Sequence, residues 1–226
     1  SLLAPSIDMD RLAAYLDDPI VQSDDRLRLR CLVIKGETDE DVDPMLAQES
    51  WREAEAIAER IDEPRWANRA RGEIGFMSLL IGDLSSGVIQ VTQALTEARQ
   101  NGDDPSLVRW LTLFGASFTE IGRPQQAVDY FDQALKVAAG IPDLQFPVMT
   151  YLAKADALIQ LQQYLQADAL LNEALTAAQR VGSLGYEAEV TLKRADIASQ
   201  RGQTEQAIQL LGAAASLVCY GFVGSV

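Results

Sequence analysis

The sequence repeats itself every 40 residues, and this period constrains the fold more than any other feature. Small residues recur at one position of the repeat, large apolar residues at a second and alanine at a third. Four repeats follow one another without a gap, which indicates a stacked architecture in which each repeat contacts its neighbours. The three sets are Gly75, Gly115, Ala155 and Ala195; Val91, Phe131, Leu171 and Leu211; and Ala94, Ala134, Ala174 and Ala214.

Each repeat is expected to form two helices. In the clearest repeat, residues 107–121 contain no helix breaker, and Gly122 follows as a residue suited to a helix C-terminus. Pro124 suits the first turn of a second helix, whose apolar side chains fall on one face. No segment alternates polar and apolar residues with a period of two, so no sheet is expected. The sequence therefore predicts an all-α fold.

The small residues of the first helix have a packing role in this fold. A glycine or alanine there lets the backbone of the second helix approach closely, and the large residue of the second helix fills the space beside the contact. One face of each helix pair then stays uncovered until the next pair packs against it. We expect Phe131 and Leu171 to be buried and each to cost about 2–5 kcal/mol of stability when replaced by alanine.

At these positions the sequence resembles the tetratricopeptide repeat, in the branch with repeats of about 40 residues found in bacterial signalling and transcription regulators. That family has a small residue in its first helix, then an alanine, a bulky residue and a second alanine in its second helix. Gly115, Ala127, Phe131 and Ala134 match this pattern. The common repeat of the family has 34 residues, so the second helix should be longer here. The resemblance implies a right-handed superhelical solenoid of antiparallel helix pairs.

The whole chain, residues 1–226, is expected to form one such solenoid. Residues 1–62 are assigned to an irregular N-terminal cap and a degenerate repeat, because stacked proteins need capped ends. Within this segment, helices are predicted over 8–17 and 24–35, an acidic loop over 36–43, and a long helix from Asp43-Pro44 through Trp51. The repeats are assigned to 63–103, 104–143, 144–183 and 184–220, and the tail to 221–226.

Composition excludes several classes of function. The chain has no histidine, which excludes Ser-His-Asp and Cys-His catalysis and histidine-ligated zinc. Its formal net charge of −14 argues against nucleic-acid binding by this region, since phosphates are bound by Lys and Arg. Cys31 and Cys219 form no CxxC pair, which favours a reducing compartment, and no apolar run is long enough for a membrane span. We predict a cytoplasmic protein that is not an enzyme.

No metal or cofactor site is predicted. The acidic stretch 36–43 fails the calcium-loop pattern, because the sixth residue counted from Asp39 is Pro44 and the twelfth is Ser50, where glycine and glutamate are required. The sequence also has no phosphate-binding loop and no nucleophile motif of the GxSxG or SxxK type. A solvated acidic loop is the simpler interpretation.

The resemblance implies a concave wall formed by the first helix of each repeat, which a peptide could occupy. Arg69 and Arg109 are expected to pair with a ligand carboxylate, and Arg109→Ala to leave stability nearly unchanged. The alternative is that these residues belong to solvated helix faces. Trp51, Trp66 and Trp110 are interpreted as core residues. The candidate binding residues are Arg69, Glu73, Phe76, Arg109, Thr112, Met149, Asp156, Glu189, Lys193 and Asp196.

Two functions fit these features. The first is a non-catalytic protein- or peptide-binding scaffold that is part of a larger protein. The second is a ligand-sensing regulatory segment of a multidomain bacterial signalling or transcription regulator, and an enzyme is the least favoured third alternative. Residues 213–226 carry no charge. They form a cap, continue into further chain or make a protein contact, and this uncharged C-terminal tail is the candidate surface for self-association.

Overall fold

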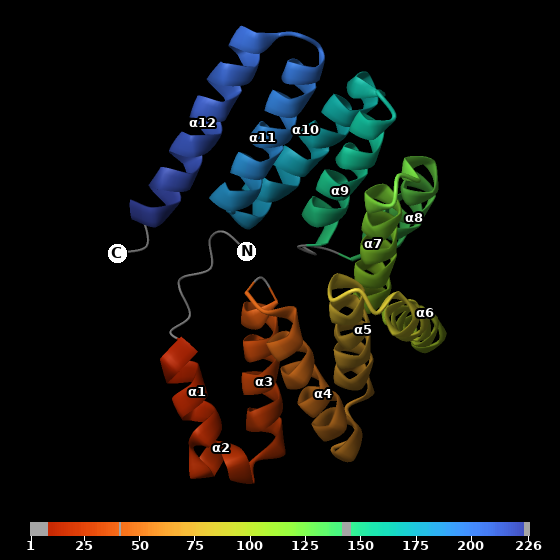
Figure 1. Cartoon of the computed structure of the whole chain (residues 1–226), viewed down its shortest axis with the longest axis vertical. Helices are drawn as coiled ribbons and strands as arrows, with labels where there is room; N and C mark the ends of the chain where they lie inside the picture. Colours follow the sequence, from red (N-terminus) through yellow and green to blue (C-terminus); the bar gives the residue numbers. More distant parts are fainter. Residues whose placement is uncertain (1–8, 41, 142–145, 224–226) are drawn as a thin grey trace. The chain divides into compact units, whose positions relative to one another are not determined.

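The computed structural model describes residues 9–40, 42–141 and 146–223, and these residues form α-helices joined by short turns (Figure 1). No strand occurs in these ranges, which confirms the predicted all-α class. The helices are α1 (Met9–Asp17), α2 (Pro19–Ser23), α3 (Asp25–Asp39), α4 (Pro44–Arg60), α5 (Pro64–Leu80), α6 (Leu84–Asn101), α7 (Asp104–Glu120), α8 (Pro124–Ala138), α9 (Phe146–Gln160), α10 (Tyr164–Val181), α11 (Leu184–Gln200) and α12 (Thr204–Val223).

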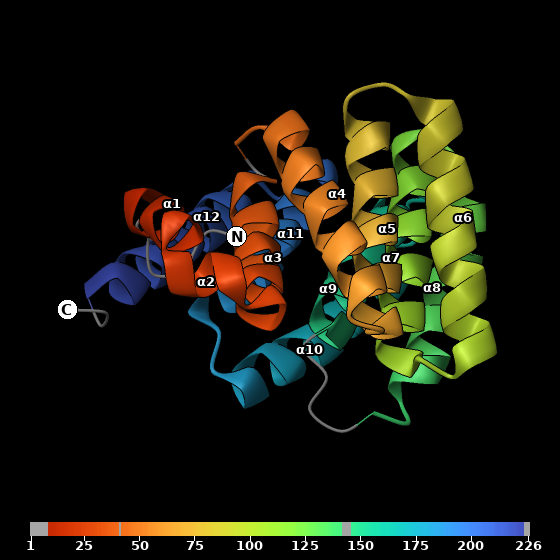
Figure 2. The same ribbon diagram turned by 90° about the horizontal axis from the view of Figure 1, so that it is seen from below.

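The chain forms two compact units, and it passes from the first to the second within α7, between Trp110 and Leu111. In the first unit, α1 and α2 pack on α3, and α3, α4, α5 and α6 pack consecutively. Figure 2 shows α5 and α6 of this unit side by side. In the second unit, α8 packs on α9, α9 on α10, α10 on α11 and α11 on α12. Within each unit the helices therefore pack in consecutive pairs, as the repeat predicts.

The turns between helices follow the repeat closely. Residues with positive φ occur every 20 residues, alternately in the turn inside a helix pair and in the turn between two pairs. Position 142, which belongs to the same series, lies outside the described residues. Most are glycines, because glycine adopts this left-handed conformation without a steric penalty. The predicted helix end at Gly122 is confirmed. The residues of the series are Asp62, Gly82, Gly102, Gly122, Gln162, Gly182 and Gly202.

The predicted contact between a small residue and a large one is present in the second unit. A Cβ atom added to Gly115 of α7 would lie 2.6 Å from the Phe131 ring of α8, so only glycine fits there without a shift. Phe131 and Leu171 are fully buried, as predicted. Leu211, at the same position of the last repeat, is 48% exposed, so the expectation of a buried side chain is wrong there. The last helix, α12, packs against α11.

The N-terminal part differs from the prediction in two elements, the short helix α2 (Pro19–Ser23), which was not predicted, and the end of α3. Residues 36–39 are not an acidic loop, because α3 continues to Asp39. Asp39 is buried and accepts a hydrogen bond from Lys35 one turn earlier. Gly36 lies against the Trp51 ring, where an added Cβ would be 2.7 Å from the ring. The predicted start of α4 is confirmed, since the Asp43 carboxylate accepts from the Met45 N–H at 2.9 Å.

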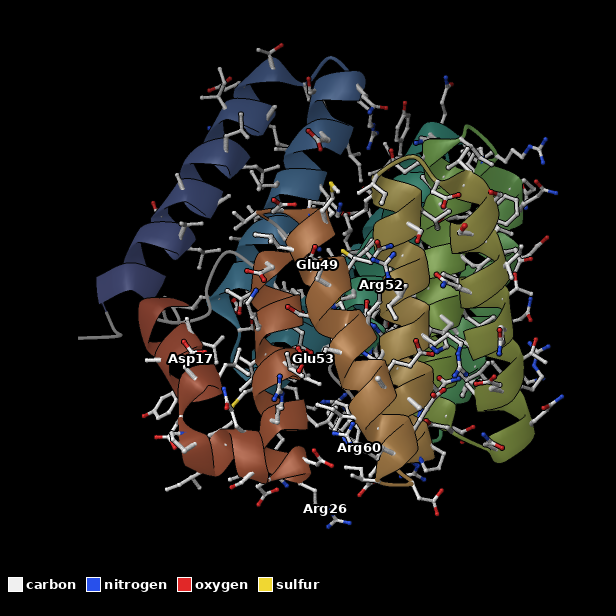
Figure 3. The ribbon with its side chains drawn as sticks, turned by 60° about the horizontal axis from the view of Figure 1, so that its bottom comes forward. Asp17, Arg26, Glu49, Arg52, Glu53 and Arg60 are labelled. Atoms are coloured by element: carbon white, nitrogen blue, oxygen red, sulfur yellow. The ribbon has the colours of Figure 1, made fainter. Side chains whose placement is uncertain are left out.

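Ion pairs at the outer ends of α3 and α4 join the two helices and the turn after α4. Arg60 donates to both oxygens of Asp25 at 2.9 and 2.6 Å, and Arg26 pairs with Glu63 at 3.2 Å. The Arg60 guanidinium lowers the pKa of Asp25 through this hydrogen bond. Figure 3 shows Arg26 and Arg60 at this end of the helices, with Glu53 further along α4. Exposed pairs of this kind contribute little to stability.

The tryptophans separate into two classes. Trp51 and Trp110 are fully buried, which confirms that they are core residues. Trp66, near the start of α5, is 37% exposed, so its prediction as a core residue is wrong. Within the described ranges, none of the helices combines the length and apolar character that crossing a membrane requires.

The burial of Phe131 can be tested against its exposed counterpart Leu211. We expect Phe131→Ala to lower the free energy of unfolding by about 3–5 kcal/mol, because a buried ring leaves a cavity. Leu211→Ala should cost about 1 kcal/mol or less, since half of the side chain already contacts solvent. Urea titrations followed by circular dichroism measure both values. Equal losses for the two variants would contradict the burial pattern.

Candidate functional site

The residues predicted to line a binding face lie on α5, α7, α9 and α11, the first helices of the four pairs. Because the border between the two compact units falls within α7, these residues form two groups that are considered separately. Arg69, Glu73, Phe76 and Arg109 belong to the first unit, and Thr112, Met149, Asp156, Glu189, Lys193 and Asp196 belong to the second.

A buried carboxylate is the centre of the group in the first unit. Glu73 on α5 has no exposed surface, and its Oε1 accepts from Arg69 Nε at 2.6 Å and pairs with the Arg109 guanidinium of α7. Its Oε2 has no hydrogen-bond partner among the described residues. Arg69 also pairs with Glu37 of α3 at 2.9 Å. One buried acid therefore holds two arginines from two helices.

Aromatic rings complete the environment of both arginines. The Arg69 guanidinium carbon lies 5.6 Å from the Trp51 ring centre, and that of Arg109 lies 5.6 Å from the Trp110 ring centre. Cation–π contact at this distance adds to the ion pairs. The two guanidinium groups that we expected to meet a ligand carboxylate are thus engaged by Glu73. The expectation that Arg109→Ala leaves stability unchanged is revised, because it removes a partner of a buried charge.

The group in the second unit is more exposed and mostly acidic. Lys193 Nζ donates to both oxygens of Asp156, at 2.8 and 2.7 Å, and lies 3.9 Å from a Glu189 oxygen. Glu189 and Asp196 are exposed on α11, and α11 contacts α9. Three carboxylates and one ammonium give this surface a net charge of −2. We call Asp156, Glu189, Lys193 and Asp196 the acidic strip.

Two other predicted residues of the second unit lie at different depths. Met149 of α9 is 40% exposed. Thr112 of α7 is buried, and its hydroxyl lies 2.7 Å from the hydroxyl of Thr150. Thr112 therefore joins α7 to α9 through a buried hydrogen bond and does not present its side chain to solvent.

The sequence did not predict a polar network around Arg71 on α5. Arg71 pairs with Glu55 and Glu59 of α4, each at 2.9 Å, and with Glu97 of α6 at 2.6 Å. Asn68 donates to the Ala94 carbonyl and to Glu97. Burial raises the pKa of Glu55, and the nearby Arg71 opposes this effect. The network joins three consecutive helices, and the spacing of its members in the sequence gives no signal of it.

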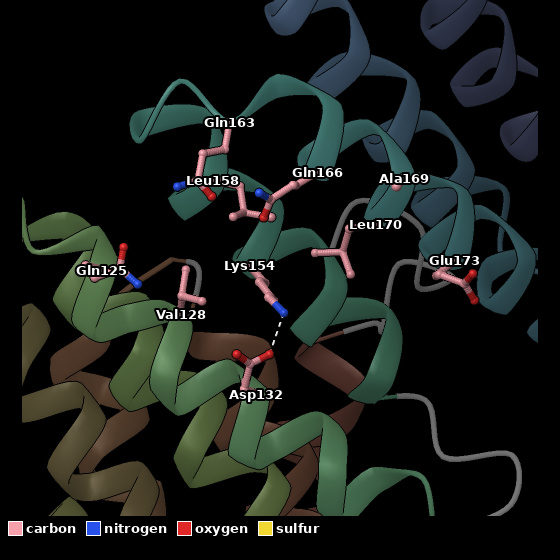
Figure 4. Close-up of a pocket in the computed structure, with 10 residues that line it drawn as sticks. All are labelled: Gln125, Val128, Asp132, Lys154, Leu158, Gln163, Gln166, Ala169, Leu170 and Glu173. Carbon is pink, nitrogen blue, oxygen red and sulfur yellow. Dashed lines mark hydrogen bonds and ion pairs between the residues drawn. The ribbon is translucent and has the colours of Figure 1, made fainter.

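A groove in the second unit was also missed. It has a volume of about 470 Å³ and lies between α8, α9 and α10 (Figure 4). Lys154 reaches across it to pair with Asp132, so the central charges already satisfy each other. The only signal in the sequence is that Lys154 is one of four lysines. The groove is lined by Gln125, Val128, Asp132, Lys154, Leu158, Gln163, Gln166, Ala169, Leu170 and Glu173.

Metal ligation gives no further candidate. Within the part of the chain that the structure describes, no three Cys, Asp or Glu side chains are grouped so that they could hold a metal ion. Among the residues predicted to bind a ligand, the acidic strip is therefore the charged group that the structure leaves most exposed.

Comparison with known proteins agrees with the predicted resemblance. Residues 150–180, in α9 and α10, match the tetratricopeptide repeat family. No curated protein sequence matches the chain. The structure is similar to that of a Rap protein complexed with Competence and Sporulation Factor, with a TM-score of 0.75 and 13% identity over 93% of this chain and 59% of that one.

A second similar structure is that of NprR in complex with its cognate peptide NprX. Its TM-score is 0.67, with 15% identity over 92% of this chain and 61% of that one. The chain thus spans about three-fifths of the length of the two proteins. At these identities the likeness shows the fold alone, and this fold agrees with the stacked helix pairs that the sequence predicted.

The buried carboxylate gives a test of the first unit. Glu73→Ala should lower the free energy of unfolding by about 3–5 kcal/mol, because Arg69 and Arg109 would stay largely buried without their common partner. Glu189→Ala is the matched control on an exposed first-helix position and should change stability by less than about 0.5 kcal/mol. Urea titration at neutral pH measures both. A small effect of Glu73→Ala would show that Glu73 is not buried as described.

Proposed function

We propose that this chain, which carries a tetratricopeptide repeat, is a non-catalytic scaffold that binds a basic peptide segment on the acidic strip. The observation that carries the proposal is the arrangement around Lys193. Lys193 pairs with Asp156 and Glu189, and Asp196 lies three residues further along α11. Glu189 and Asp196 are exposed. Lys193 neutralises one of the three negative charges of the acidic strip. A lysine or arginine of a ligand would reduce the negative charge that remains.

The spacing on α11 supports an extended ligand. Glu189 and Asp196 are seven residues apart, which places them on the same side of the helix and about 10 Å apart along its axis. Three residues of an extended chain also span about 10 Å. The same interval separates Met149 from Asp156 on α9. We therefore propose a ligand with two basic residues about three positions apart and an apolar residue that contacts Met149.

The fold likeness supports binding of a peptide in general. The two similar structures are both complexes, one of a Rap protein with Competence and Sporulation Factor and one of NprR with its cognate peptide. The ligand contacts predicted from the sequence lie on the first helices of the pairs, and the acidic strip lies on two of these helices. The ligand that we propose for this chain differs from our first expectation, because the arginines expected to meet a carboxylate are held by Glu73.

We also propose that the chain is not an enzyme and uses no cofactor. We place it in the cytoplasm, as part of a larger protein. The alternative is a ligand-sensing regulatory segment of a signalling or transcription regulator. It is favoured by the likeness to two complexes, one of them with a cognate peptide, of which the chain covers only about three-fifths. Both functions use the acidic strip. Fluorescence energy transfer between one label in each compact unit distinguishes the two functions. Peptide binding should change the distance between the labels if the chain is a ligand-sensing segment, and should leave it unchanged if the chain is a scaffold.

The acidic strip can be tested by selecting binders from a random nine-residue peptide display library on the wild-type chain. We expect enriched peptides to carry Lys or Arg and to bind more weakly as salt increases. Asp156→Asn/Asp196→Asn should weaken a selected peptide about 5- to 30-fold, since each exposed ion pair contributes about 0.5–1 kcal/mol.

The matched control is Asp129→Asn/Glu173→Gln, which removes two exposed carboxylates from α8 and α10 of the same unit. It makes the same change in net charge and should leave the affinity for the peptide within about twofold. Isothermal titration calorimetry compares the two variants. Equal loss in both variants, or enrichment of acidic peptides, would contradict binding at the acidic strip.

A further inference from the structure

The groove between α8, α9 and α10 lies on the side of α9 opposite to the acidic strip. Lys154, which lines the groove, and Asp156 of the acidic strip are two residues apart on α9. Because successive residues of a helix are rotated by about 100°, these two side chains leave the helix on nearly opposite sides. The groove volume of about 470 Å³ is in the range of known ligand sites. The groove is therefore a second candidate surface, separate from the acidic strip.

The preceding helix pair carries three aromatic rings that pack together. The centre of the Tyr130 ring of α8 lies 5.2 Å from that of the Phe118 ring of α7, and the two ring planes are 11° apart. The centre of the Phe114 ring of α7 lies 5.7 Å from that of Tyr130. Aromatic pairs at such distances attract each other beyond the effect of the buried area. The rings thus join α7 to α8.

The groove lies at the same positions one repeat later. Forty residues after the three rings, α9 and α10 carry residues with aliphatic side chains, and all three of these residues line the groove. They are Lys154, Leu158 and Leu170. Among the described residues that line the groove, none is aromatic. The repeat therefore indicates a place for an aromatic group that the residues lining the groove do not supply.

Lys154 provides a cation for such a ring. Its ammonium group pairs with Asp132 at 2.5 Å, and its side chain is 17% exposed, against 59% for Asp132 (Figure 4). The ion pair therefore holds the ammonium group within the groove. An ammonium group attracts the face of an aromatic ring, and the attraction grows when water is displaced. An aromatic group gains this contact with Lys154, and an aliphatic group of similar size does not.

Three glutamine side chains match the backbone of a peptide. Gln125 lies near the start of α8, and Gln163 and Gln166 lie at the start of α10. Among the described residues, none of these three side-chain amides has a hydrogen-bond partner. A side-chain amide both donates and accepts hydrogen bonds, as each peptide unit does. A peptide backbone can therefore bind these amides, whereas a free aromatic hydrocarbon leaves them to water.

We propose that this groove binds an aromatic side chain of a partner peptide. The ring packs on Lys154, Leu158 and Leu170, and the peptide backbone on either side of the ring contacts the glutamines. The site uses the opposite side of α9 from the acidic strip, so it does not depend on the function proposed for that strip.

An NMR titration of the ¹⁵N-labelled chain with two neutral probes tests the preference for a ring. N-acetyl-tryptophan amide carries a ring, and N-acetyl-leucine amide carries the same amide groups without one. We expect the tryptophan probe to bind at least about threefold more tightly. Its largest shifts should include the side-chain amides of Gln163 and Gln166. Equal affinities, or shifts that do not include the groove, would overturn the proposal.

A third probe distinguishes a peptide from a free aromatic molecule. 3-Methylindole has the tryptophan ring without the amide groups, so it leaves the glutamines unpaired. We expect it to bind at least about threefold more weakly than N-acetyl-tryptophan amide. If 3-methylindole binds as tightly as the tryptophan probe, a peptide is not the occupant and the proposal is overturned.

A variant that fills the groove gives the mutational test. Leu158→Phe/Leu170→Tyr introduces the residues found 40 positions earlier, so its own rings should occupy the space and lower the affinity for the tryptophan probe at least about tenfold. Leu165→Tyr/Leu192→Phe is the matched control, because it makes the same two changes at leucines that are 82% and 42% exposed. It should leave the affinity within about twofold. Equal affinities of the two variants would overturn the proposal.

Lys154→Met tests the cation without filling the groove. Methionine keeps an unbranched side chain and removes the charge. The preference for the tryptophan probe over the leucine probe should fall by about two- to fivefold, since the cation–π contact is lost. Circular dichroism checks that both groove variants remain folded. An unchanged preference in a folded Lys154→Met chain would overturn the assigned contact between the ring and Lys154.

Discussion

The close contact between a small residue of one helix and a large residue of the next is the interaction on which this structure depends. At Gly115 the Phe131 ring occupies the space that any side chain would need. The contact fixes how the two helices of a pair lie against each other, and turns at intervals of 20 residues repeat that geometry. The first helices of successive pairs then become neighbours, as α9 and α11 are. Their neighbouring faces form the acidic strip.

The sequence predicted this part of the fold because a periodic packing contact leaves a periodic pattern. The helix pairs, the turn at Gly122, the buried Phe131 and the core position of Trp51 all follow from the register of small and large residues. One error, the exposed Leu211, lies within the register, and the other errors in the fold lie where the register is absent. The extension of α3 to Asp39 depends on its burial beside Lys35, and no local rule shows that an acidic stretch continues a helix.

The candidate site was harder to predict because charged residues on a helix do not show whether they face solvent or another helix. Arg69 and Arg109 read as exposed residues, and only the position of Glu73, 36 residues before Arg109, makes them internal. Lys193 and Asp156, which form an ion pair, are similarly far apart in the sequence, at 37 residues. Helical phase thus identified which residues share a side of a helix, and long-range packing decided which of them are exposed.

The most direct test of the central claim, that the acidic strip is the binding surface, is an NMR titration. A ¹⁵N-labelled chain would be titrated with a selected basic peptide, and the backbone amide shifts recorded. The account predicts the largest shifts around Asp156 on α9 and around Glu189, Lys193 and Asp196 on α11. Shifts centred on the groove beside Lys154 and Asp132, with none on α11, would contradict it.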